Sequence, residues 1–374
     1  MSEISTQEPT VLLLITNFDI GGAERVYVHT AKALAERGSR VVAACLQWRS
    51  GRVADELSAT TVSVHDLGMS GKFDVRALYR LVQLLRRERV DVIYTFLIHS
   101  HIIGRLAGRI ARVPVIISSQ QIAGWETLPQ RLLNRFTARW CSAIVAVSKD
   151  VEEYLLADVG IPNRKLVTIY NSVDINRFLP KRGLLSDPLR PVLGTVARLN
   201  PEKDHDTLLE ALTYVHATHP GTQLLIAGDG PERQRLERKV ISMGLATSVQ
   251  FLGHLEDVRP VFAQLDLYIQ SSHVEGLSVA VLEALASGLP IVAARVGGNE
   301  EAVLDNVCGL LVEPRNPKAL AGAICQILAN PERSRLMGIA SRQHATRLFS
   351  HEAAMARMRD LIHQLLHSPR PGAA

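Results

Sequence analysis

The chain has 374 residues, a length that predicts two domains rather than one hydrophobic core. Its four cysteines lack the C-x-x-C spacing of a zinc site, which predicts a reduced, cytoplasmic setting without a structural metal. The charge is uneven, because residues 1–180 hold 22 Lys/Arg against 17 Asp/Glu and residues 181–374 hold 20 of each. The polar N-terminus and the short apolar run 11–15 predict neither a signal peptide nor a membrane span.

Two helix-like segments of the first half carry much of its positive charge, residues 76–90 and 131–140. Arginine mixed with Leu, Phe and Trp suits a helix that lies on an anionic membrane surface. The alternative interpretation is a solvated helix face over an ordinary core. No nucleic-acid motif is present and aromatic residues are few, so we expect no nucleic-acid partner.

The first half alternates between short apolar runs and amphipathic stretches, a pattern typical of a parallel sheet covered by helices on both faces. The expected strands are 11–16, 41–46, 62–66, 92–96, 115–119, 143–147 and 166–170. The expected helices are 24–37, 75–89, 102–111 and 149–158.

Residues 171–190 contain prolines and a glycine without a long apolar period, and we interpret them as an interdomain linker. A second alternation follows, with strands at 192–197, 223–227, 249–252, 267–270, 291–294 and 309–312. Its helices are expected at 205–218, 232–243, 278–287 and 316–329. The predicted class is therefore α/β, with one doubly wound domain over 1–178 and another over 179–349. A cleft between the carboxyl ends of their strands would bind the ligands.

The last segment, residues 350–374, is expected to pack back on the first domain. Ser350 is a plausible N-cap, and apolar residues follow it at helical spacing up to residue 367.

The sharpest local motif is HVEGLSVAVLEALASGLPIV at 273–292. Glu275 comes just after a predicted strand, and Gly276 would let the backbone approach a ligand closely. Leu277 and Ser278 open a helix whose free N–H groups suit a pyrophosphate. Glu283 lies within this largely apolar helix, where it could accept hydrogen bonds from ribose hydroxyls while Glu275 holds sugar hydroxyls. The alternative roles are a dipole-favoured first-turn acid and an exposed helix residue.

The pattern E-G-L-S-x₄-E followed by A-x-G-x-P resembles the donor-site signature of the retaining glycosyltransferases of family 4, which have the GT-B architecture of two Rossmann-like domains. Further segments resemble the same family in the same order along the chain. They are GGAERVYVHTAKALAERG (21–38), ARLNPEKDHDTLLEAL (197–212), AGDGPER (227–233), FLGH (251–254) and VGGNEE (296–301).

The resemblance implies that Arg198 and Lys203 grip the pyrophosphate of the donor. Preplaced cations would stabilise the charge that builds on the leaving phosphate without a divalent metal, and two surface cations are the alternative reading. Gly21 and Gly22 follow the first predicted strand and could let the backbone approach a phosphate or the acceptor; a simple tight turn is the alternative. The absence of G-x-G-x-x-G disfavours a dehydrogenase.

One competing motif is Asp204-His205-Asp206, which has the D-x-D spacing of metal-binding glycosyltransferases of another architecture. The motif opens a predicted helix, where aspartate is a common cap, so we expect capping and no metal site or other cofactor.

The residue beside the reacting sugar is left open by the sequence. Many family members carry a histidine where this chain has Gln120, whose amide cannot take a proton. His99 and, as the weaker candidate, His101 lie in the preceding segment, and a capping or surface role is the alternative for both. The resemblance further places Leu252–His254 near the nucleotide base, and Gly228–Gly230 either borders that site or forms a strand-to-helix turn.

The resemblance implies retaining transfer of a hexose or related sugar from a nucleotide diphosphate sugar, with a UDP-sugar favoured. The acceptor would be a glycan, a lipid-linked molecule or another hydroxyl compound of bacterial cell-surface synthesis, met at the inner face of the cytoplasmic membrane. Two alternatives are a nucleotide-sugar epimerase of the same architecture and a non-catalytic sugar-binding protein with two hinged lobes.

Overall fold

The computed structural model describes residues 8–18, 21–47, 52–71, 74–180, 187 and 189–368. Contacts divide the chain into two compact units. The first comprises Met1–Ile169 and Ala354–Ala374, and the second comprises Tyr170–Ala353. Part of the expected linker, residues 181–186 and 188, lies outside the described residues, as do residues 369–374 of the expected C-terminal segment.

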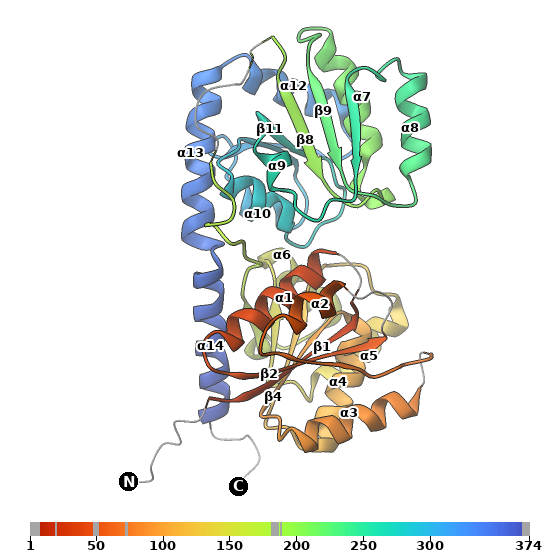
Figure 1. Cartoon of the computed structure of the whole chain (residues 1–374), viewed down its shortest axis with the longest axis vertical. Helices are drawn as coiled ribbons and strands as arrows, with labels where there is room; N and C mark the ends of the chain where they lie inside the picture. The colour runs from red at the N-terminus through yellow and green to blue at the C-terminus, as the bar shows by residue number, and fades with distance from the viewer. Residues whose placement is uncertain are drawn as a thin grey trace. The chain divides into compact units, whose positions relative to one another are not determined.

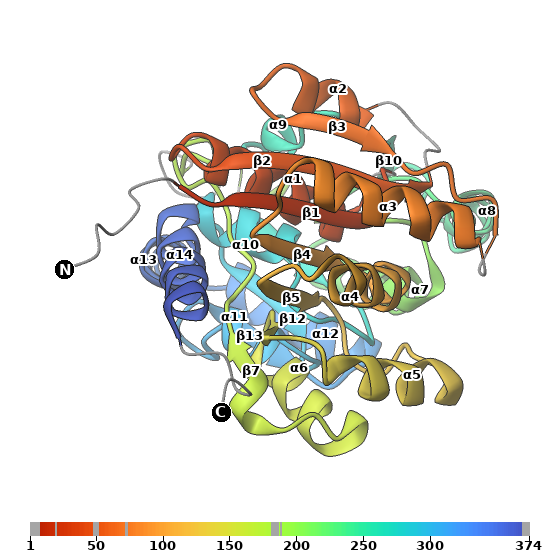
Figure 2. The same cartoon turned by 90° about the horizontal axis from the view of Figure 1, so that it is seen from below.

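Seven parallel strands form the sheet of the first unit in the order β3-β2-β1-β4-β5-β6-β7. Figure 1 labels β1, β2 and β4 of this sheet, and Figure 2 shows them in order with β3 and β5. Each arises from one of the predicted apolar runs, because strands buried on both faces need side chains that are apolar on both faces. Val11 of the central strand pairs with Val41 on one side and Val92 on the other. The strands are β1 (Thr10–Asn17), β2 (Arg40–Gln47), β3 (Ser63–Asp66), β4 (Val92–Phe96), β5 (Val115–Gln120), β6 (Ala143–Ala146) and β7 (Leu166–Thr168).

Helices cover both faces of this sheet. On one face α1, α2 and α14 share a core with the strands, and on the other α3, α4 and α5 form a continuous layer (Figure 2). The helices are α1 (Gly22–Ala35), α2 (Arg52–Ser58), α3 (Val75–Arg87), α4 (Ile98–Ala111), α5 (Leu128–Ala138), α6 (Lys149–Tyr154) with the π-helical η1 (Leu155–Val159), the short η2 (Asn163–Lys165), and α14 (His351–His367).

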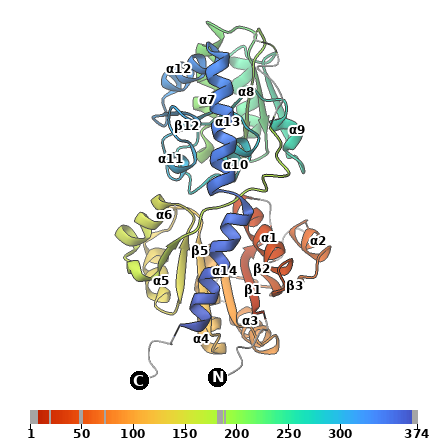
Figure 3. The same cartoon turned by 90° about the vertical axis from the view of Figure 1, so that its left-hand side faces the viewer.

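The C-terminal helix α14 belongs to the core of the first unit. Met355, Met358, Leu361 and Ile362 are buried against the strands and α1, and Figure 3 looks onto this helix with the strands behind it. The Ser350 side chain accepts a hydrogen bond from the Ala353 amide at 3.3 Å, as expected of an N-cap.

Six parallel strands form the sheet of the second unit in the order β10-β9-β8-β11-β12-β13. All six coincide with predicted strands. They are β8 (Val192–Val196), β9 (Gln223–Ala227), β10 (Val249–Gly253), β11 (Leu267–Gln270), β12 (Ile291–Ala294) and β13 (Gly309–Val312).

Helices α7, α8 and α12 bury their apolar side chains against one face of this sheet, whereas α10 packs against α13 and α11. The sequence prediction did not include α9, α11 or the 18-residue α13. The second-unit helices are η3 (Pro201–Lys203), α7 (His205–His216), α8 (Arg233–Ser242), α9 (Arg259–Phe262), α10 (Val279–Ala286), α11 (Asn299–Ala302), α12 (Pro317–Leu328) and α13 (Pro331–Leu348).

Candidate functional site

The predicted donor residues of the second unit lie at the carboxyl edge of its sheet, at the topological switch point. Strands β8 and β11 are neighbours there, and the chain continues from β8 to β9 on one side and from β11 to β12 on the other. Arg198 and Lys203 follow β8, and Glu275 follows β11. Open α/β sheets bind ligands at such points, so topology brings these three residues to the expected place.

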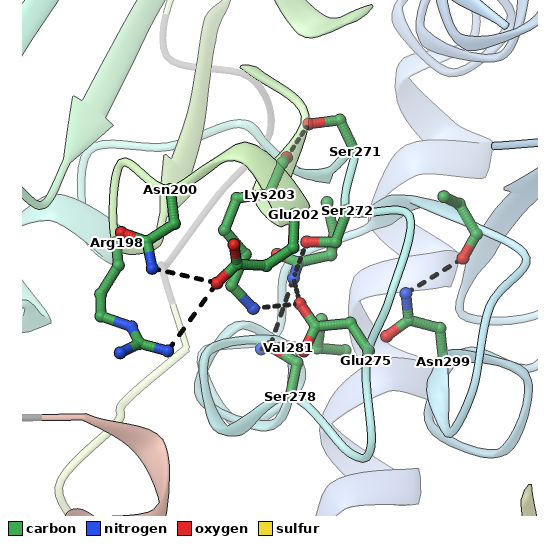
Figure 4. Close-up of polar contacts among 12 residues, drawn as sticks. Arg198, Asn200, Glu202, Lys203, Ser271, Ser272, Glu275, Ser278, Val281 and Asn299 are labelled. Atoms are coloured by element: carbon green, nitrogen blue, oxygen red, sulfur yellow. Dashed lines mark hydrogen bonds and ion pairs between the residues drawn. The ribbon is translucent and has the colours of Figure 1, made fainter. Parts of the chain in front are cut away.

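The two loops at the switch point are bonded to each other (Figure 4). Lys203 Nζ lies 2.6 Å from Glu275 Oε1, and both side chains are largely buried. The Ser271 hydroxyl donates to the Lys203 carbonyl at 3.0 Å, and the His273 amide donates to the Glu202 carbonyl at 3.0 Å. The cation and the carboxylate are therefore held on a rigid frame.

Glu275 is held in place by a chain of hydrogen bonds from two side chains of strand β11 that the sequence analysis did not single out. Gln270 Nε2 donates to Glu275 Oε1 and, at 3.0 Å, to the Ser272 hydroxyl. The Tyr268 hydroxyl in turn donates to Gln270 Oε1 at 3.0 Å. Burial raises the pKa of Tyr268, and the carboxylates of Glu275 and Glu283 add to the effect, so Tyr268 stays a neutral donor. The only sequence signal for this relay was two polar residues, Tyr and Gln, two positions apart in an apolar strand.

Helix α10 begins beside this carboxylate. Ser278 is its N-cap and accepts a hydrogen bond from the Val281 amide at 3.4 Å. The first-turn N–H groups of a helix have no intrahelical partners and carry partial positive charge, which favours an anion. Glu283 is buried within the same helix, so the alternative of an exposed helix residue was wrong.

The loop between Glu275 and Ser278 is fixed through its carbonyl groups. The Gly276 carbonyl accepts from the Gly298 amide at 2.7 Å, which connects it to the predicted VGGNEE segment. The Leu277 carbonyl accepts from Asn171 Nδ2 at 3.1 Å. Asn171 is buried, and the sequence reading missed it because it assigned this residue to a linker.

Arg198 differs from Lys203 in its exposure. Its side chain is 58 % accessible and lies 3.9 Å from the Glu202 carboxylate, to which Asn200 Nδ2 donates at 3.1 Å. Arg198 is thus a weakly held cation at the rim of the loop, whereas Lys203 is an anchored one.

Two glycines after β9 are explained by close contact with the Arg198 loop. A Cβ atom on Gly228 would lie 1.8 Å from the Ala197 carbonyl oxygen, and one on Gly230 would lie 2.5 Å from the Leu199 carbonyl oxygen. The Leu199 amide also donates to the Asp229 carbonyl at 2.9 Å. The Gly-Asp-Gly turn therefore supports the backbone on which Arg198 stands.

His254 follows β10 at the same edge of the sheet. The Gly230 amide is the main cause that lowers the pKa of Asp229, and the charge of His254 contributes to the same shift. His254 therefore lies within electrostatic reach of Asp229.

The Asp204-His205-Asp206 segment caps α7, as predicted. Asp204 accepts from the Thr207 amide at 3.3 Å, and Asp206 lies 2.6 Å from both Arg235 and Lys239. Within the described ranges, no three His, Cys, Asp or Glu side chains gather in a way that could hold a metal ion.

The first unit has an equivalent switch point between β1 and β4. Gly21 is the N-cap of α1, which begins at Gly22. His99 is the second residue of α4, which begins four residues before the helix expected at 102–111. Thr16 Oγ1 and Ser100 Oγ, 3.1 Å apart, connect the end of β1 to the start of α4. The glycine pair and His99 therefore lie at the same edge of this sheet.

Gln120 ends the neighbouring strand β5 with a defined orientation. Its Nε2 donates to the Ile122 carbonyl at 3.0 Å and to Glu126 Oε1 at 3.4 Å. Both partners can only accept, so the amide nitrogen must face them and the amide oxygen is turned elsewhere. Gln120 can thus accept a hydrogen bond from a ligand through its amide oxygen, whereas its N–H groups are already used.

His101 is a core residue, so both a capping and a surface role were wrong for it. The imidazole Nδ1 lies 2.9 Å from the Thr95 hydroxyl, and the side chain is 1 % exposed. Burial, together with the charge of Arg105, holds the pKa of His101 well below its usual value. A neutral, buried ring of this kind supports the packing of α4.

Two Rossmann-like units with candidate sites at their switch points define the GT-B fold, and comparison with known proteins gives the same class. Residues 180–344 match the profile of the glycosyl transferases group 1, and residues 20–177 match that of glycosyltransferase family 4. The chain belongs to this glycosyltransferase family, as the sequence predicted.

Two relatives illustrate the similarity. The lipopolysaccharide core biosynthesis glycosyltransferase LpsE of Rhizobium meliloti is 32 % identical over 91 % of this chain and 96 % of its own. The GDP-mannose-dependent alpha-(1-6)-phosphatidylinositol monomannoside mannosyltransferase of Mycolicibacterium smegmatis is 31 % identical over 70 % of this chain and 73 % of its own.

Solved structures share the fold. Anabaena HepE in complex with UDP-glucose has a TM-score of 0.85 at 21 % identity, covering 96 % of this chain and 100 % of that one. Sucrose-phosphate synthase of Thermosynechococcus elongatus has a TM-score of 0.80 at 21 % identity, covering 95 % and 99 %. In the part of the chain that the structure describes, no helix combines the length and apolarity that crossing a bilayer requires.

Proposed function

We propose that this glycosyltransferase moves a hexose or related sugar, with retention, from a nucleotide diphosphate sugar to a hydroxyl acceptor. The observation that carries the proposal is the Lys203–Glu275 pair, 2.6 Å apart at the start of α10. It combines a fixed cation, a fixed carboxylate and a helix N-terminus in one place. The cation and the helix N-terminus suit a diphosphate, and the carboxylate suits the hydroxyl groups of a sugar.

In this proposal Arg198 and Lys203 bind the donor pyrophosphate and stabilise the charge that develops on it as the glycosidic bond breaks. Groups that are already in place when charge develops need no reorganisation, so they are effective without a divalent metal. Glu275 accepts hydrogen bonds from the sugar, and Glu283 and His254 serve the nucleoside. Retention follows if the acceptor attacks from the face of the leaving phosphate, which takes the acceptor's proton.

A UDP-sugar is the donor that we favour. HepE, which shares the fold, was solved with UDP-glucose, and an Escherichia coli relative of 25 % identity is named as a UDP-Gal-dependent galactosyltransferase. The mycobacterial relative is named as GDP-mannose-dependent, so a GDP-sugar is the competing donor that the first experiment must include.

The acceptor that we propose is a glycan or lipid-linked molecule of bacterial surface polysaccharide or glycolipid synthesis. The names of the relatives support it, because they include a lipopolysaccharide core enzyme, a phosphatidylinositol mannoside enzyme and a diphosphoundecaprenol enzyme. Such an acceptor would place the enzyme in the cytoplasm, in peripheral contact with the inner face of the membrane.

The first test is a binding and hydrolysis screen of the purified protein against UDP-, GDP- and ADP-sugars with and without EDTA. We expect one UDP-sugar to bind and to be hydrolysed slowly, with no effect of EDTA. If none of the three classes binds, the proposal fails.

A second test replaces Glu275 by alanine. We expect sugar transfer or donor hydrolysis to fall by roughly 100-fold or more, because a preplaced group is removed, while circular dichroism stays unchanged. Glu313→Ala is the matched control, since that carboxylate is 74 % exposed on the same unit. Normal turnover of the Glu275 variant would contradict the assigned role.

A further inference from the structure

Helix α5 has its polarity reversed relative to an ordinary surface helix. The side chains that it buries against the first unit are Asn134, Thr137 and Ala138. The large side chains that it exposes are apolar: Leu128, Leu132, Leu133 and Phe136. A helix on the surface of a globular protein normally presents the opposite arrangement.

The polar face of α5 is fixed inward by a buried arginine. Arg105 Nη1 donates to Asn134 Oδ1 at 2.7 Å and to the Thr137 hydroxyl at 3.0 Å. Asn134 Nδ2 donates to Glu126 Oε1 at 2.8 Å, and Tyr154 donates to the other oxygen of this buried carboxylate at 3.0 Å. Turning the helix over would leave the buried Arg105 guanidinium without these acceptors, so the apolar face is held outward.

The exposed apolar face is wide and ends in aromatic residues. Leu128, Leu132 and Phe136 repeat at four-residue spacing and so share one stripe of the helix. Trp125, just before the helix, is also exposed. The guanidinium of Arg139 lies 3.6 Å from the ring centre of Phe136 and 5.2 Å from that of Trp140. Aromatic rings beside arginine are typical of the interface between lipid and water.

The helical layer that contains α5 carries more arginines than acids. Residues 127–149 contain no Asp or Glu, and residues 74–140 contain 11 arginines, no lysine and four acidic residues. One arginine and one acid of this set, Arg105 and Glu126, are buried, which leaves the surplus unchanged. This stretch forms α3, α4 and α5, which lie side by side on one face of the sheet (Figure 2). The local surplus exceeds the +5 of the whole chain.

We infer that the outer face of α5, made of Trp125, Leu128, Leu132, Leu133 and Phe136, is a docking surface for an anionic lipid bilayer. Apolar side chains would enter the interface, and the arginines would pair with lipid phosphates. A second copy of the chain fits less well, because it would bring a second set of arginines against the first. The inference deepens the proposed function, since it gives a physical basis for access to a lipid-linked acceptor.

The test is sedimentation of the full chain with vesicles of phosphatidylcholine containing about one-third phosphatidylglycerol, and with phosphatidylcholine alone. We expect binding to the anionic vesicles that weakens with salt. The variant Leu128→Gln/Leu132→Gln/Phe136→Gln should lower the partition coefficient by roughly tenfold or more, because binding scales with the apolar area that enters the interface.

Two controls keep this experiment interpretable. Ile241→Gln removes an apolar side chain of the second unit that is 69 % exposed, close to the 66 % of Leu128, and should leave vesicle binding unchanged. Arg135→Gln, next to the apolar stripe, should reduce binding to anionic vesicles by roughly fivefold. Circular dichroism and the thermal midpoint of each variant report whether the fold is retained.

Three results would overturn the inference: no binding of the wild-type chain to either vesicle, equal losses in the α5 and Ile241 variants, or a wild-type dimer that the α5 substitutions dissociate. The last result would assign the face to a second copy. Donor binding is measured on the same samples. Vesicle binding without donor binding would contradict the proposed function but not the docking surface. Donor binding without vesicle binding would contradict the docking surface but not the proposed function.

Discussion

Lys203 and Glu275 come from loops that follow different strands, yet Nζ and Oε1 lie 2.6 Å apart in a largely buried contact. Each residue satisfies a charge that would otherwise be costly to bury, so neither can be removed without affecting the other. The pair therefore contributes to both stability and donor binding. A double-mutant cycle that measures both quantities separates the two effects.

We expect Lys203→Ala to lower kcat/KM for the donor by about 10²–10³-fold, because one preplaced cation is lost. In a double-mutant cycle with Glu275→Ala, urea unfolding should show a coupling energy of about 0.5–3 kcal/mol. Lys239→Ala removes from α8 a cation that is paired with Asp206 of α7, and as the control it should retain activity. Strictly additive effects would mean that the 2.6 Å contact carries no energy.

Tyr268 acts on Glu275 only through Gln270. We expect Tyr268→Phe to lower kcat by roughly tenfold and to destabilise the fold by about 1 kcal/mol, since it deletes one buried hydroxyl and leaves the Gln270 oxygen without this donor. Steady-state kinetics and urea unfolding measure the two effects. Tyr214→Phe, on an exposed ring of α7, should change neither. Full activity of the Tyr268 variant would show that Gln270 alone fixes the carboxylate.

The turn after β9 should be intolerant of any side chain. Gly228 has a φ of +139°, and its Cβ would meet a carbonyl oxygen at 1.8 Å, so Gly228→Ala must displace the Arg198 loop. We expect a destabilisation of about 2–3 kcal/mol and a loss of donor affinity. Gly322→Ala in α12 meets nothing within 4 Å and should instead stabilise by about 0.5–1 kcal/mol. Titration calorimetry measures the affinity for the donor. An unchanged affinity in the Gly228 variant would mean that the Arg198 loop is not displaced.

Acid should destabilise the second unit through His205. Burial, with the charge of Lys203, lowers the pKa of His205 from 6.5 to about 4. Above pH 6.5 both folded and unfolded forms are neutral; below it only the unfolded form gains the proton, so the free energy of unfolding falls as the pH drops from 6.5 to 4. The full loss is about 3 kcal/mol. Urea unfolding of the wild type and of His205→Gln at several pH values should show a smaller loss of unfolding free energy in the variant. Equal losses in both proteins would mean that His205 does not cause the acid destabilisation.

The sequence predicted the 13 strands of the described sheets because most of them are short apolar runs between turn residues, a pattern that buried parallel strands require. Helix α13 was missed because its apolar residues follow no clear helical period, although Asn330 as N-cap before Pro331 was a usable signal. Local pattern identified an element where its apolar residues were clustered or regularly spaced, which those of α13 are not.

The candidate site was predictable where one motif places its residues on one loop, as for Glu275, Gly276 and Ser278. The hydrogen-bond relay from Tyr268 through Gln270 to Glu275 was not predictable, because it depends on contacts that form only in the folded chain. His101 was misread for the same reason, since its partner Thr95 lies on the preceding strand. The outward face of α5 was also beyond local pattern, because the buried charge of Arg105 reverses the usual rule.

Helix α14 completes the core of the first unit although it follows the whole second unit along the chain. Residues 170–350 are synthesised before it, so the second unit can fold while the first still lacks Met355, Met358 and Leu361. We expect ribosome-arrested chains ending after α13 to show a protease-resistant second unit and a sensitive first one. Equal resistance of both would mean that the N-terminal strands and helices suffice. A sensitive first unit in these chains would mean that it reaches its final fold only after α14 has been made.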